Sequence, residues 1–154
     1  GMTLDALKTI LREQKTCCKA LVGLLQKERG HLVDFDLGAM EGLAKEKDTL
    51  LLRLRLLEEE RIRLVAALSA DAPDGAAGDV TLRGLVERTG DAELAGIRLD
   101  LVSLVQSIED LNGFNRHLID RSLGSLRTSI GFFQAFGGVR PERGASGTLV
   151  SRET

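Results

Sequence analysis

Aromatic residues are scarce in this chain of 154 residues, which contains no tryptophan, no tyrosine and five phenylalanines. We therefore do not expect a large globular core built on aromatic anchors. Charge is nearly balanced: the formal net charge is −2, so no excess of Lys and Arg is available to displace counterions from nucleic acid. Apolar runs fall far short of the roughly 20 residues that span a bilayer, and the N-terminal segment lacks the apolar core of a signal peptide. A soluble intracellular protein, with one domain and a tail, is the expectation.

Cysteine is also rare, and its placement excludes the usual cysteine chemistry. Cys17 and Cys18 are neighbours on a predicted helix, so their side chains point about 100° apart. This arrangement cannot reproduce the Cys-x-x-Cys spacing of a redox or zinc site. We expect one small buried residue beside a partly exposed one, and no disulfide.

Leucine and charged residues dominate instead, and apolar side chains recur at alternating steps of three and four. This spacing predicts an all-α fold: an elongated antiparallel helical bundle, or coiled-coil-like hairpin, with a long C-terminal helix. The rows of apolar positions are Leu4, Leu7, Leu11, Cys18, Leu21, Leu25 and Leu32 in the first segment, Met40, Leu43, Leu50, Leu54, Leu57, Leu64 and Leu68 in the second, and Leu94, Ile97, Leu101, Leu104, Ile108 and Leu111 in the last.

Turn and cap residues divide the chain into helices. The predicted helices span about residues 3–33, 36–69, 81–89 and 91–136, within a single domain of residues 1–137. Thr3 and Asp5 offer the start of the first helix, and the Asp34-Phe35-Asp36 cluster marks the first turn, with an aspartate as the cap of the second helix. Thr81 and Asp91 are the expected caps of the last two helices, and residues 70–79 form the main break. The last helix is expected to end at the Gly137-Gly138 pair, and the small, polar residues 138–154 predict a disordered tail.

Two cations interrupt the apolar row of the second helix. Lys47 and Arg61 take positions where their stems can cover apolar surface while their charges reach water. The many charged residues around them are typical of a solvated helix face rather than of a site.

The last row is interrupted by asparagine. From Leu111 it continues to Asn115 and then to Ile119 in two steps of four, an insertion that locally unwinds a supercoil. Asn112 lies three residues before Asn115, on nearly the same helical face. A buried asparagine needs hydrogen-bond partners, and such residues are best known for fixing register and partner choice.

The sequence contains no catalytic motif, and its one motif with metal-site spacing is incomplete. No Gly-rich phosphate loop and no nucleophile elbow occurs. Glu28-x-x-His31 has the spacing of di-iron bundles, but those sites need two such motifs, and His117 has Phe114 three residues before it. We expect no metal, no cofactor and no enzymatic activity. The alternative hypothesis of a metal-binding bundle enzyme would be supported if the purified protein contained stoichiometric iron or manganese.

Four of the five phenylalanines lie between Phe114 and Phe136, and three of them cluster at the end of the last predicted helix. Two interpretations remain open. These side chains cap the core of the bundle, or they form an apolar patch that receives another helix.

The order of these features resembles the FlgN family of bacterial flagellar export chaperones. The resemblance covers roughly residues 4–136. It rests on Leu-Leu-x-Lys-Glu-Arg at residues 24–29, on Leu43-Ala-Lys-Glu-Lys and residues 61–68 in the second helix, and above all on Asn112-x-x-Asn115-x-x-Leu118-Ile119 followed by Ser122-Leu123.

The resemblance implies a cytoplasmic, ATP-independent chaperone of the flagellar type III secretion system. Its partners would be the C-terminal helices of the hook–filament junction proteins FlgK and FlgL, together with components of the export apparatus, and neither nucleic acid nor a membrane. Asn112 and Asn115 would fix register. Mapped by position, the partner-binding residues, termed the contact row, are Leu118, Ile119, Leu123, Leu126, Ile130, Phe133 and Phe136. The alternative is a structural coiled-coil adaptor or oligomerisation module without cargo.

Overall fold

The computed structural model describes residues 1–70 and 81–135, with side chains for all of them except residues 122, 125–130, 132 and 133. These residues contain four helices and no strand: α1 (Met2–Asp34), α2 (Leu37–Ala70), α3 (Leu82–Thr89) and α4 (Ala92–Gln134). The all-α fold class is confirmed. The predicted main break at residues 70–79, the Gly-Gly pair and the predicted tail at 138–154 lie almost entirely outside the described residues.

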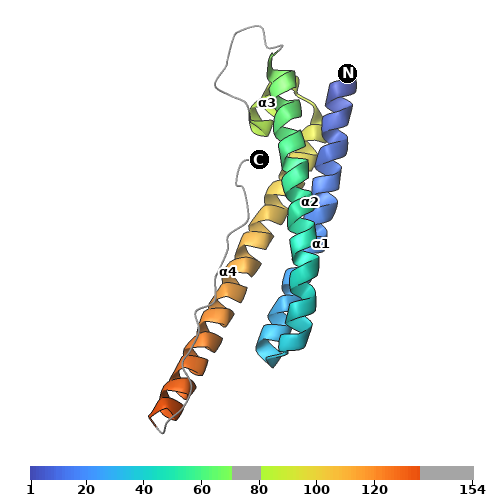
Figure 1. The fold of residues 1–154 in the computed structure, drawn as a ribbon. Coiled ribbons are helices and arrows are strands. Elements are labelled where there is room, and N and C mark those ends of the chain that lie inside the picture. The colour runs from blue at the N-terminus through green and yellow to red at the C-terminus, as the bar shows by residue number, and fades with distance from the viewer. Residues whose placement is uncertain (71–80, 136–154) are drawn as a thin grey trace.

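The helices form an elongated bundle around α1. Helices α1 and α2 make an antiparallel hairpin, while α4 packs along α1 in the same direction (Figure 1). The short α3 packs on α2 and α4 at the end where the chain passes from one to the other. At 1.5 Å per residue, the 33 residues of α1 span about 50 Å and the 43 residues of α4 about 65 Å. Helix α4 therefore continues past the turn between α1 and α2 (Figure 1).

Polar contacts set the register between α1 and α4. Lys8 pairs with Asp91 near one end of the bundle, and Asn115 contacts Leu25 farther along. The paired positions are 83 and 90 residues apart, so residue numbers rise together along the two helices. This near-constant separation gives the level on α1 for each α4 residue that lies before the end of α1.

The turn between α1 and α2 is closed by backbone hydrogen bonds. The Asp36 amide donates to the His31 carbonyl at 2.9 Å and the Phe35 amide to the Leu32 carbonyl, the Schellman pattern that ends many helices. Phe35 adopts the left-handed conformation with φ 55°, which costs a non-glycine residue roughly 1–2 kcal/mol. The Asp36 carboxylate then accepts from the Ala39 amide at 3.1 Å, confirming an aspartate cap on α2.

The predicted caps of α3 and α4 are confirmed. The Thr81 hydroxyl accepts from the Gly84 amide at 3.0 Å, and the Asp91 carboxylate accepts from the Leu94 amide at 2.9 Å. Each bond satisfies an amide that has no partner within the helix.

The predicted cap of α1 is wrong. This helix begins at Met2, so Thr3 already lies inside its first turn. Gly1 takes the cap position without a side-chain hydrogen bond, and its carbonyl accepts from the Asp5 amide at 3.1 Å.

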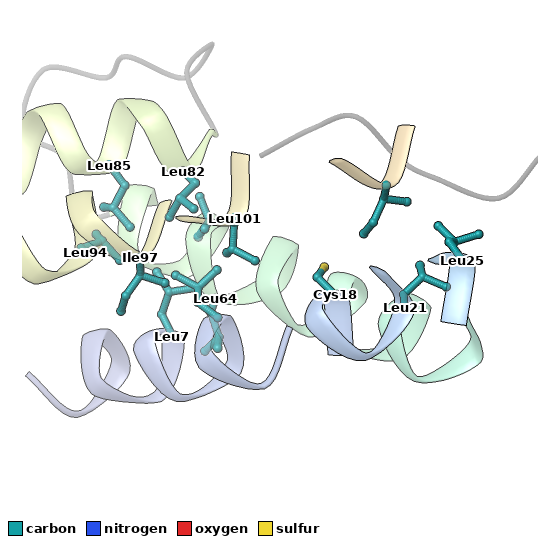
Figure 2. Close-up of a cluster of buried hydrophobic side chains, with 13 residues drawn as sticks. Leu7, Cys18, Leu21, Leu25, Leu64, Leu82, Leu85, Leu94, Ile97 and Leu101 are labelled. Carbon is teal, nitrogen blue, oxygen red and sulfur yellow. The ribbon is translucent and has the colours of Figure 1, made fainter. Parts of the chain in front are cut away.

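The predicted apolar rows of α1 and α4 form the core. Its members come from all four helices, and Figure 2 shows α3 and α4 side chains meeting those of α1 and α2 at one end of the cluster. The row of α2 is only partly buried, because this helix packs chiefly on α1. The core residues are Leu7, Leu11, Cys18, Leu21, Leu25, Leu64, Val65, Leu82, Leu85, Leu94, Ile97, Leu101 and Ile108.

Arg61 corrects one expectation for α2. Its charge does not reach water: the side chain is buried and pairs with Glu58 on the same helix. Glu58 also accepts a hydrogen bond at 2.9 Å from Gln14 of α1, itself buried. The charge is therefore paired inside a polar layer between α1 and α2, the condition under which buried ions are tolerated. Lys47 stays partly exposed.

Candidate functional site

Helix α4 changes its surroundings at Asn115. We term residues 92–115 the proximal segment and residues 116–134 the distal segment. In the proximal segment the apolar row is buried or partly buried against α1, with Leu94, Leu101 and Ile108 among the core residues. Asn115 is 1% exposed, and it is the last buried side chain of α4 among those described.

The Asn115 amide attaches α4 to α1. Its nitrogen donates to the backbone carbonyl of Leu25 and to a carboxylate oxygen of Glu28, both at 2.9 Å. Because both partners are acceptors, the NH₂ group must face them, which fixes the orientation of the amide. The Asn115 carbonyl oxygen is buried and has no hydrogen-bond partner, a cost that an apolar residue would not carry.

Glu28 also connects this contact to α2. Its other carboxylate oxygen lies 3.4 Å from the Lys47 ammonium of α2, and both side chains are only partly exposed. Asn115, Glu28 and Lys47 therefore form a polar cluster, termed the polar clasp, that links α4, α1 and α2 near the start of the distal segment. A paired set of this kind favours one register over its neighbours.

The polar clasp also explains the Glu28-x-x-His31 motif. Glu28 accepts a hydrogen bond from the Asn115 amide and pairs with the Lys47 ammonium group. In residues 1–70 and 81–135, no group of three or more His, Cys, Asp and Glu side chains could hold a metal ion.

Ion pairs tie the proximal segment to α1 as well. Lys8 pairs with Asp91 at 2.9 Å, and Lys15 pairs with Asp100 at 2.6 Å. The pKa of the Asp91 carboxyl is lowered, chiefly by the hydrogen bond from the Leu94 amide and then by Lys8. The Lys15 hydrogen bond likewise lowers the pKa of Asp100. Both carboxylates are thus stabilised in their charged form at neutral pH.

The contact row lies only partly within the described side chains. Leu118 is half-buried, while Ile119 and Leu123 are 36% and 39% exposed. Leu126, Ile130 and Phe133 belong to α4, but their side chains are not described, and Phe136 lies beyond residue 135. Asn112 is half-buried and Phe114 is exposed, so these two do not join Asn115 in the core.

The α1–α2 turn carries an apolar surface that the sequence analysis missed. Val33, Phe35 and Leu37 are 63%, 63% and 73% exposed, and they lie within five consecutive residues. We term these three residues the tip patch. The sequence does contain a phenylalanine between two aspartates at this place, but the sequence analysis interpreted that cluster only as a turn.

The cysteines behave as predicted. Cys18 is buried and Cys17 is partly exposed. Burial raises the pKa of the Cys18 thiol to about 11, and burial also raises that of Cys17. Burial thus favours the neutral thiol over the thiolate at both positions.

Comparison with known proteins identifies the family of this chain. The chain matches the FlgN protein family over residues 2–148, nearly its whole length. No protein of curated function and no solved structure matches it significantly. Among the described helices, none is long and apolar enough to cross a membrane. The chain therefore belongs to the FlgN family, the flagellar export chaperones.

Proposed function

We propose that this chaperone binds the C-terminal helices of the hook–filament junction proteins FlgK and FlgL in the cytoplasm. It keeps them unassembled and delivers them to the export apparatus. The distal segment of α4 is the proposed cargo surface, and the contact row is the set of residues that touches the cargo helix. No catalytic step is required, because covering an apolar helix face is a binding equilibrium.

The observation that carries this proposal is the change of exposure along one helix. Apolar residues continue at helical spacing on both sides of Asn115; the row before it is buried or partly buried, whereas after it, among the described side chains, Leu118 is half-buried and Ile119 and Leu123 are exposed. Ile119 and Leu123, which follow Asn115 in the sequence, leave apolar surface in water. Helix α4 continues past the end of the hairpin (Figure 1). A partner helix with an apolar face would cover that surface and gain about 25 cal/mol for each Å² buried.

Cargo of this kind suits the geometry. Junction proteins polymerise through amphipathic terminal helices that are exposed before assembly, and such segments order when they meet a complementary face. A helix lying along the distal segment would hide the face that drives polymerisation. The polar clasp keeps the proximal segment on α1, so the distal segment stays available.

The test is the affinity for synthetic peptides of the FlgK and FlgL C-terminal helices from the same organism, measured by titration calorimetry. Ile119→Asp and Leu123→Asp should each weaken binding at least about tenfold, since losing 1.4 kcal/mol is tenfold in affinity. Leu99→Asp is the matched control, because Leu99 is an exposed apolar residue of the proximal segment. Its affinity should match that of the unmodified chain.

Four results would contradict the proposal. If the unmodified chain binds neither peptide, the proposed cargo is wrong. If the variants stay helical and bind normally, the surface lies elsewhere. If Ile119→Asp unfolds the chain, the row is core. Self-association through the distal segment without peptide binding would favour the coiled-coil adaptor.

A further inference from the structure

We propose that the tip patch forms the second half of the cargo site, so that a cargo helix packs between Val33, Phe35 and Leu37 on one side and the distal segment of α4 on the other. This inference rests on the proposed function. It adds a second surface of the chaperone, which would contact the side of the cargo helix that faces away from α4. The first observation is exposure. All three side chains are mostly exposed, and they lie within five consecutive residues at one end of the hairpin.

The backbone at Phe35 gives the second observation. Position 35 follows the end of α1 in the left-handed conformation, where glycine is the usual residue because it has no Cβ. This chain instead holds a large apolar side chain there, strained and 63% exposed. The Schellman hydrogen bonds need the left-handed backbone at position 35, but they do not need a phenylalanine there, since glycine makes the same bonds without the strain. Strain retained at an exposed position is typical of a functional constraint.

Register brings the two surfaces to the same level of the bundle. Asn115 lies beside Leu25 and Glu28, and α1 and α4 run in the same direction. Counting the same number of residues along each helix from this contact sets Ile119 and Leu123 level with the last turn of α1 and the tip patch. Figure 1 shows α4 leaving the hairpin at this end.

Charge defines the occupant. Exposed Asp34 and Asp36 flank Phe35, so the tip patch has acidic edges. The distal segment presents Arg116 and Arg121 around a single Asp120, so its exposed charge is mainly basic. The helix that fits between them has an apolar stripe with basic residues along the edge facing the tip and acidic residues along the edge facing α4. We assign this place to the amphipathic terminal helix of the cargo.

The sharpest test is Phe35→Gly, because the strain and the binding surface reside in the same residue. Glycine relieves the left-handed conformation, so the midpoint of urea unfolding should stay equal or rise. Affinity for the FlgK helix peptide should fall at least about tenfold, because the apolar surface that the phenylalanine ring buries against the cargo is lost. A loss of binding without a loss of stability cannot be explained by damage to the fold.

A matched pair on α2 controls for lost apolar surface in general. Leu37→Ser removes a leucine of the tip patch, and Leu52→Ser removes one that is 55% exposed farther along the same helix. Only the first should weaken peptide binding. If Phe35→Gly and Leu37→Ser bind normally while Ile119→Asp does not, the proposed function stands and the tip patch has no part in it. If the unmodified chain binds no peptide, both proposals fail.

Contact is tested directly by a photoreactive phenylalanine analogue at position 35. With the FlgK helix peptide present, illumination should give an adduct of one chain and one peptide. Dimers of the chain formed to the same extent with and without peptide would show that a second copy covers the tip patch, which overturns the inference. Absence of any adduct overturns it as well.

Discussion

The proximal and distal segments of α4 belong to one continuous helix and carry apolar residues at similar spacing, yet they differ in what covers them. Proximal residues such as Leu94 and Leu101 are buried against α1 and α3, and ion pairs from Lys8 and Lys15 hold this segment in place. In the distal segment, Ile119 and Leu123 remain exposed. Apolar periodicity thus indicates that a helix face will be covered without saying whether this chain or another covers it.

Length and the polar clasp explain where the change occurs. Helix α1 ends at Asp34, so it cannot cover the whole of α4. Asn115 marks the last point at which α4 is fixed to α1, through Leu25 and Glu28. The buried asparagine costs stability compared with leucine, but it stops the apolar rows from sliding past one another.

The largest effect should separate the two segments by stability. Leu94→Ala removes a fully buried leucine and should lower the free energy of unfolding by about 2–5 kcal/mol. Leu123→Ala removes a partly exposed leucine of the distal segment and should change it by less than about 1 kcal/mol. Urea unfolding followed by circular dichroism measures both. Equal losses for the two variants would mean that the distal segment is as well packed as the proximal one.

A smaller effect should locate the boundary at Asn115. Asn115→Asp sets a buried carboxylate against the Glu28 carboxylate and the Leu25 carbonyl, so it should destabilise the fold by about 2–3 kcal/mol at pH 7. The pKa of this new carboxyl would be raised in the folded state. Its penalty should therefore grow as pH rises above the ordinary range of aspartate and fade as pH falls through that range.

Asn115→Leu is the control for size. It removes the unpartnered carbonyl oxygen and leaves Glu28 paired with Lys47, so stability should stay within about 1 kcal/mol of the unmodified chain. A destabilisation by leucine as large as that by aspartate would show that the asparagine bonds, rather than burial of charge, hold the segment.

Much of the fold follows from the sequence because local rules decide it. The spacing of leucines predicts which faces are buried, and the caps at Thr81 and Asp91 depend on residues only three positions apart. Burial of Asn115 was foreseeable because it occupies an apolar row. Its partners were not, since Leu25 and Glu28 are 90 and 87 residues away and depend on how α4 lies along α1.

Two features could not be read from spacing. Arg61 was expected to reach water, but it is buried and pairs with Glu58, which also accepts a hydrogen bond from Gln14 of α1. The tip patch at Phe35 was taken as a turn only, because exposure of an apolar side chain depends on which helices fail to reach it. In both cases the deciding fact is tertiary rather than local.

Amide hydrogen exchange along α4 tests the central claim most directly. In the free chain, amides of residues 92–115 should exchange slowly and those of residues 116–134 quickly, because only the first segment is packed on α1. Addition of the FlgK helix peptide should protect residues 116–134 and the tip patch while leaving the proximal segment unchanged. Equal protection of both segments in the free chain, or peptide protection confined to residues 92–115, would contradict the account.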